Sequence, residues 1–161
     1  MSDLKKTFTS LWTGELVAVL VFWFDYFVFK WIIPGIGPIV SVTYALIILS
    51  FILVQGSAFW LIMLKRLSDP NYMAGTAGKI FKILKYIDVI LMCLGVAVIF
   101  IFPDTVFATV FAFLVLLFAL IEWINYYLWR LSYSMNPSVL LGRIKNRRLK
   151  KSKIAKEIEN S

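Results

Sequence analysis

Four long apolar blocks divide this 161-residue chain. A helix rising 1.5 Å per residue needs about 20 residues to cross a hydrocarbon layer of roughly 30 Å, and each block is close to that length. The blocks are continuous runs such as LIILSFILV, without the inside–outside alternation of a membrane β-barrel. The composition, 61% hydrophobic and 16% charged, is also that of a membrane protein. The sequence therefore predicts an all-α, integral membrane four-helix bundle.

The predicted helices form two transmembrane hairpins, with spans at about residues 14–33, 39–64, 86–102 and 105–127. Residues 1–137 are expected to be the transmembrane domain. Residues 138–161 are expected to be a basic, amphipathic cytoplasmic tail. The first span is not interpreted as a cleaved signal peptide, because it is too long, contains Asp25 and lacks a small-x-small cleavage site.

Basic residues indicate the orientation. Sixteen of the 17 Lys and Arg residues fall in the N-terminal segment, the connection between the two hairpins, or the segment after the fourth span. The exception is Lys30. The positive-inside rule then places both termini in the cytoplasm, as in a multi-pass protein of the cytoplasmic membrane. Lys30 lies near the outer end of the first span, where its long side chain can reach the interface.

One polar residue from each span falls in a layer about 6 Å thick when depth is counted inward from the outer turns. The candidate residues of this embedded polar layer, with one polar neighbour on the fourth span and one just after it, are Glu15, Gln55, Asp88, Glu122, Asn125 and Arg130. Three interpretations remain open. The acids could support the fold at the interface, form salt bridges with Arg130 or Lys85, or bind a proton or cation.

Asp25 is a candidate acid at the bilayer centre, because it lies well inside the first apolar block. An Asp at that depth costs roughly 2.5 to 3.5 kcal/mol on the insertion scale. Asp25 is therefore expected to face the bundle, with Ser50 of the second span as a hydrogen-bond partner. A structural role and a transport role both remain open.

Two basic stretches are expected to contact an anionic inner leaflet. Residues 78–87 combine lysines with apolar residues at helical spacing, which predicts an amphipathic helix in the interface before the third span. The C-terminal tail is strongly basic and already tethered at the membrane, so lipid rather than nucleic acid is its expected partner. The candidate lipid-binding residues are Lys79, Lys82, Lys85, Arg143, Lys145, Arg147, Arg148, Lys150, Lys151 and Lys153.

The sequence lacks the residues of several common chemistries. It contains no histidine, and its one cysteine, Cys93, falls inside the third span. Histidine catalysis, a Cys/His zinc site and an intramolecular disulfide are therefore excluded. No catalytic residue, metal site or cofactor is expected, and the chain is not expected to be an enzyme.

The leading hypothesis is a non-catalytic accessory or interaction subunit that works through its cytoplasmic face, as a homo-oligomer or within a larger membrane complex. The alternative is an oligomeric proton- or cation-coupled transporter of small solutes that uses the embedded carboxylates. The chain resembles the small multidrug resistance transporters in its four helices and in Glu15. It is longer than those proteins and carries a basic tail, so membership is not inferred.

Overall fold

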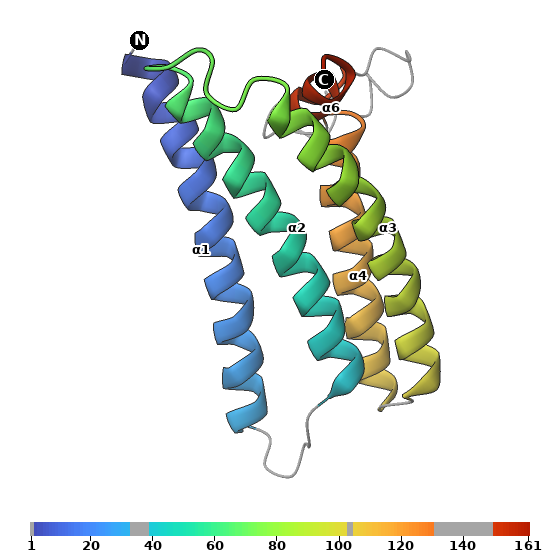
Figure 1. The fold of residues 1–161 in the computed structure, drawn as a ribbon. Coiled ribbons are helices and arrows are strands. Elements are labelled where there is room, and N and C mark those ends of the chain that lie inside the picture. Colours follow the sequence, from blue (N-terminus) through green and yellow to red (C-terminus); the bar gives the residue numbers. More distant parts are fainter. Residues whose placement is uncertain (1, 33–38, 103–104, 131–149) are drawn as a thin grey trace.

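Four long helices and one short helix make up the part of the chain that the structure describes (Figure 1). The structure is a computed structural model and describes residues 2–32, 39–102, 105–130 and 150–161. Its helices are α1 (Ser2–Ile32), α2 (Val40–Lys65), α3 (Thr76–Ile101), α4 (Val106–Tyr127) and α6 (Lys153–Glu159). Helices α1 to α4 are long and apolar enough to cross a membrane. The predicted all-helical fold with four membrane-span-capable helices is confirmed.

Both termini lie at the same end of the bundle (Figure 1), which we call the termini end. The connection between α2 and α3 lies at this end too, and so does α6. At the opposite end, seven residues separate α1 from α2 and four separate α3 from α4. Among the described residues, folded structure outside the four long helices is therefore concentrated at the termini end.

Helix α2 is the centre of the bundle, since it packs against α1, α3 and α4. Its buried apolar residues are the largest contribution, 8 of 20 residues, to one continuous apolar core that also contains residues of α3, α4 and α6. Small residues allow close packing where α3 meets its neighbours: a Cβ atom added to Gly95 would lie 3.0 Å from Ile48 and 3.2 Å from Leu116. Much of the outward surface of the four helices is apolar, as expected for helices in lipid.

Two helices are longer than the sequence predicted. Helix α1 begins at Ser2 rather than near residue 14, and α3 begins at Thr76 rather than residue 86. The prediction of a separate interfacial helix at residues 78–87 is wrong, because these residues are the first turns of α3. No Pro or Gly interrupts α3 between Gly78 and Gly95, and Phe81 is buried edge-on against Phe59 of α2, which aligns these turns with the bundle.

The C-terminal segment folds back onto the termini end of the bundle. The backbone N–H of Arg130 donates to Lys150 (2.9 Å), and that of Ser152 donates to Leu128 (3.1 Å), so the two stretches run side by side. Ser152 then caps α6 by accepting a hydrogen bond from the N–H of Ala155 at 2.9 Å. Ile154 is 3% exposed. The last part of the predicted tail is therefore packed on the bundle.

Candidate functional site

A buried hydrogen-bonded group joins α2, α3 and α4. The side-chain amide of Gln55 donates to Oδ1 of Asp88 at 2.8 Å. The hydroxyl of Tyr127 donates to the amide oxygen of Gln55. Asp88 is 0% exposed, Tyr127 1% and Gln55 5%. Hydrogen bonds gain strength in such an apolar environment, so this group ties three helices together.

One oxygen of this group is unsatisfied. Oδ2 of Asp88 is buried and has no hydrogen-bond partner within the described ranges. A buried polar atom without a partner is costly, and most native proteins contain few of them. Asp88 is therefore the carboxyl group best placed to hold a proton or to accept a hydrogen bond from a further donor.

A second polar group lies between α1 and α4. The amide of Asn125 donates to Oε2 of Glu122 at 3.3 Å. Glu15 of α1 lies near Glu122 and near the hydroxyl of Tyr126. That hydroxyl is buried, and it makes no hydrogen bond of regular geometry with the described residues. Two of the predicted acids therefore lie close together, while Asp88 lies in a separate group.

Gly56 allows Tyr126 to take this position. A Cβ atom at Gly56 would lie 2.5 Å from the Tyr126 ring and 2.6 Å from its hydroxyl oxygen. Tyr126 therefore lies directly over the backbone of α2. This contact connects the α1–α4 polar group to the helix that carries Gln55.

Arg130, predicted for the embedded polar layer, lies outside it. Helix α4 ends at Tyr127, and Arg130 is exposed where the chain turns to pair with Lys150. Trp129, two residues after the end of α4, is also exposed. Lys85 is half-buried, and its backbone carbonyl accepts a hydrogen bond from the indole of Trp123 at 3.3 Å.

The expectation that Asp25 faces the bundle is wrong. Asp25 is exposed on the surface of α1. The neighbouring side chains face inward instead: Trp23 donates to Ser50 at 2.9 Å, and Tyr26 shares a 2.7 Å hydrogen bond with Thr43. Ser50, the expected partner of Asp25, is thus engaged by Trp23, because Asp25 lies on the other side of the helix.

The candidate lipid-binding lysines have different environments. Lys79, Lys82, Lys150, Lys151 and Lys153 are exposed, and the ammonium group of Lys153 also lies over the rings of Phe8 (4.6 Å) and Trp60 (5.2 Å). Burial lowers the pKa of Lys153, and the nearby charge of Arg130 lowers it further. Lys153 therefore fastens α6 to α1 and α2. Four other candidates lie outside the described residues: Arg143, Lys145, Arg147 and Arg148.

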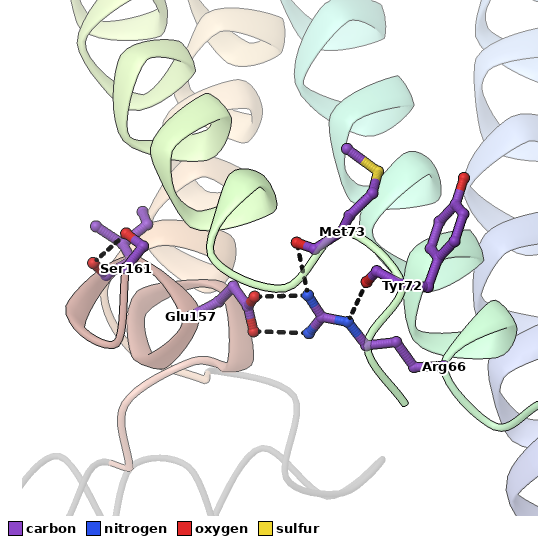
Figure 2. A network of polar contacts seen from close by, with 6 residues as sticks. Arg66, Tyr72, Met73, Glu157 and Ser161 are labelled. Carbon is purple, nitrogen blue, oxygen red and sulfur yellow. Dashed lines mark hydrogen bonds and ion pairs between the residues drawn. The ribbon is translucent and has the colours of Figure 1, made fainter. Parts of the chain in front are cut away.

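Arg66 and Glu157 connect the end of α2 to α6 (Figure 2). The guanidinium Nη2 lies 2.7 Å from Oε1 of Glu157, and Nη1 lies 2.9 Å from Oε2. Arg66 also donates to the backbone carbonyls of Tyr72 and Met73, at 2.9 and 3.2 Å. The hydrogen bonds to Glu157 raise the pKa of Arg66 above its usual value, so the guanidinium stays charged. We call this contact the C-terminal latch.

A glycine brings α6 close to α3 beside the latch. A Cβ atom at Gly78 would lie 2.5 Å from the carbonyl oxygen of Glu157 and 2.5 Å from Cβ of Ser161. The backbones of α3 and α6 are therefore in direct contact. Any larger residue at this position must displace the C-terminal helix.

No group of three or more His, Cys, Asp or Glu side chains that could hold a metal ion occurs among residues 2–32, 39–102, 105–130 and 150–161. The chemistry available at the buried sites is that of carboxyl, amide and phenol groups. These groups can exchange a proton or hold helices together by hydrogen bonds.

No family model matches the sequence, and no curated protein or solved structure matches it. The functional assignment therefore depends on the side-chain geometry.

Several important residues were absent from the sequence-based candidates. Tyr127 falls at the end of the fourth predicted span, five residues or about 7.5 Å beyond Glu122, so depth counting does not place it in the polar layer. Arg66 and Glu157 are 91 residues apart, and no local pattern relates them.

Proposed function

We propose that the protein is a small accessory or interaction subunit of the cytoplasmic membrane, without catalytic activity of its own, that binds its partner through the termini end. The observation that carries the proposal is the C-terminal latch. Three contacts hold α6 in a defined position: the bidentate Arg66–Glu157 ion pair, the close backbone contact at Gly78, and the packing of Lys153 on Phe8. A surface held so firmly is suited to recognition.

In this proposal, the termini end faces the cytoplasm. All exposed lysines of the described chain except Lys30 lie at the termini end, which supports that orientation under the positive-inside rule: Lys5, Lys6, Lys65, Lys79, Lys82, Lys150, Lys151, Lys153 and Lys156. Reporter fusions after Ser161 and within residues 33–38 should then give opposite signals. An external C-terminus would overturn the orientation.

Anionic lipid of the inner leaflet is the proposed environment of Lys79 and Lys82. Both are exposed on the first turns of α3, next to exposed Ile80 and Ile83. Each lysine near an anionic surface contributes about 1 kcal/mol, and salt screens the attraction. Lys153 is excluded from this lipid contact, since it packs on aromatic rings within the chain.

The decisive experiment is quantitative co-purification from cross-linked membranes in mild detergent. Three chains are compared: the wild type, a Lys156→Glu variant of the termini end, and a Leu94→Ala/Leu117→Ala control on the exposed helix faces. We expect one stoichiometric membrane partner that the termini-end variant loses and the control retains. The absence of such a partner, or its equal retention by both variants, would overturn the proposal.

A second candidate, proton- or cation-coupled transport, is favoured by the unpartnered oxygen of buried Asp88. Tyr127, which is hydrogen-bonded to Gln55, also lines a pocket of about 230 Å³ between α3, α6 and the end of α4. Only the side chain of Tyr127 therefore separates this pocket from the hydrogen-bonded pair Gln55 and Asp88. Ion flux through the purified chain, abolished by Asp88→Asn, would establish this function instead.

A further inference from the structure

The pocket between α3, α6 and the end of α4 has a charged side and an apolar side. It has a volume of about 230 Å³, and its walls combine two lysines and one acid with aromatic and aliphatic side chains. This volume is below the roughly 300–1,000 Å³ of ordinary small-molecule sites, so the pocket suits a single headgroup better than a whole solute. The main lining residues are Lys85, Tyr127, Trp129, Lys151, Ile158 and Glu159.

Lys85 is the half-buried cation of this pocket. It lies 16 residues, or about 24 Å, from the end of α3 at Ile101. A hydrocarbon core is roughly 30 Å thick, so Lys85 begins near the edge of the core at the termini end, and its long stem can carry the ammonium to the level of the lipid phosphates. Within the described residues, this ammonium has no ion pair or hydrogen bond. Its charge is therefore available to a ligand.

Lys151 is the second cation, and the chain holds it weakly. Its ammonium lies 2.5 Å from Oε1 of Glu159, and the two side chains are 56% and 53% exposed. Ion pairs exposed to this extent contribute little, because water and salt screen them. Lys151 can therefore exchange Glu159 for another anion. The two lysines and one acid leave the pocket with one positive charge in excess.

Apolar surface continues from the pocket along α3. Val89 and Cys93 follow Lys85 at spacings of four residues, so they lie on the same face of the helix, and both are exposed. Trp129, which lines the pocket, is 45% exposed, and tryptophan is enriched in the headgroup layer of membranes. A free anion has no contact to make with this apolar surface, whereas the acyl chains of a phospholipid can lie along it.

We propose that this pocket binds the phosphate group of one anionic phospholipid. Lys85 and Lys151 contact the phosphate, and the acyl chains lie along α3 towards Cys93. Basic pockets between membrane helices on the cytoplasmic side bind anionic headgroups for the same reason. This is a single site, in contrast to the diffuse attraction proposed for Lys79 and Lys82. It rests on the proposed function for its orientation, which places the termini end at the anionic inner leaflet.

Native mass spectrometry of the full chain tests the site. The protein is held in a neutral detergent and titrated with phosphatidylglycerol, and the dissociation constant of the first bound lipid is measured. Lys85→Gln should raise this constant about five-fold, the effect of one lysine near an anionic headgroup. Lys82→Gln is the matched control, because it removes the same charge from an exposed position of α3 outside the pocket. Its effect should be below about two-fold, since salt screens a distant charge.

Two further variants separate binding from folding. Lys85→Arg keeps the charge and should keep the dissociation constant within about two-fold of the wild type. Glu159→Gln removes the competing acid at an exposed position and should tighten binding about two-fold or more. The purified chain is measured without a partner, so failure of the lipid site leaves the proposed function standing, and failure to find a partner leaves these lipid constants unchanged.

Four outcomes would overturn the proposal. Equal effects of Lys85→Gln and Lys82→Gln, or a Glu159→Gln chain that does not bind more tightly, would remove the pocket as the site. Equal affinity for phosphatidylcholine would show that the charge of the lipid does not matter. Displacement of the lipid by an equal concentration of inorganic phosphate would assign the pocket to a free anion instead.

Discussion

Arg66 and Glu157 form a bidentate ion pair, although they are 91 residues apart in the sequence. The two nitrogen–oxygen distances are 2.7 and 2.9 Å. Their side chains are 17% and 19% exposed, compared with 56% and 53% for the Lys151–Glu159 pair on the same segment. Charge-assisted bidentate hydrogen bonds are stronger when they are shielded from water. The Arg66–Glu157 pair should therefore contribute more than the Lys151–Glu159 pair to the docking of α6.

Glu157→Gln should therefore weaken the docking of α6 by about 1 kcal/mol, because one charge-assisted hydrogen bond is lost and the charge of Arg66 is left uncompensated. Spin labels on Lys82→Cys and Lys156→Cys in a Cys93→Ser chain would report the α3–α6 distance. Glu159→Gln is the matched control, with an expected effect below about 0.5 kcal/mol. Equal undocking in both variants would contradict the importance of the latch.

Gly78→Ala should displace α6 without unfolding the bundle. The new Cβ would lie 2.5 Å from a backbone oxygen of Glu157, and backbone cannot move as cheaply as a flexible side chain. Overpacking of this kind costs about 1–3 kcal/mol. The same spin-label distance measures the effect. Gly14→Ala, where the added atom meets open space, should leave that distance unchanged.

Lys153 gives the docking of α6 a pH dependence of known sign. Burial lowers its pKa below the ordinary value of 10.5, so just below that pH the undocked segment binds more protons than the docked one. Docking should therefore strengthen as the pH rises through this window. Arg66 does not change there, because its pKa is raised. Lys153→Met should remove the pH dependence of the spin-label distance. Docking that still strengthens with rising pH in this variant would contradict the assignment to Lys153.

The sequence specified some parts of this structure better than others. Helices α2 and α4 were predicted within one residue at each end, because their apolar blocks stop where the helices stop. The starts of α1 and α3 were missed, since the lysines there lower the hydropathy without breaking the helix. Hydropathy is a poor guide to the inward face of a helix that is apolar all round, which explains the error at Asp25.

Contacts between distant residues were the other limit. Depth counting predicted a polar layer that contains Gln55 and Asp88, and the structure shows them hydrogen-bonded. It could not separate this group from Glu15 and Glu122, because depth gives no position around the bundle axis. The C-terminal latch depends on the path of the chain after α4, which no local pattern encodes.

The hydrogen-bonded group of Gln55, Asp88 and Tyr127 should stabilise the bundle in a graded way. Asp88→Leu leaves a buried amide donor of Gln55 unpaired and should cost about 1–3 kcal/mol. Tyr127→Phe removes one donor and should cost about 1 kcal/mol, near the average for hydrogen bonds in membranes. Asp88→Asn keeps an acceptor for Gln55 and should cost least. Unfolding in detergent mixtures measures the order, and equal stability of all three variants would contradict it.

Glu122→Gln separates the two candidate functions. Glu122 accepts a hydrogen bond from Asn125 at 3.3 Å and lies near Glu15, so the amide preserves size and relieves repulsion between two acids. An accessory subunit should keep its partner and remain at least as stable, since no charge is needed there. A transporter that used this carboxyl would keep its fold but lose pH-dependent flux, because an amide cannot exchange a proton near neutral pH. The measurement is proton and cation flux in liposomes under imposed gradients, with Asn125→Ala as a control that retains the acid. We expect no flux in any of the three chains, and flux in the wild type that Glu122→Gln abolishes would assign transport to this chain.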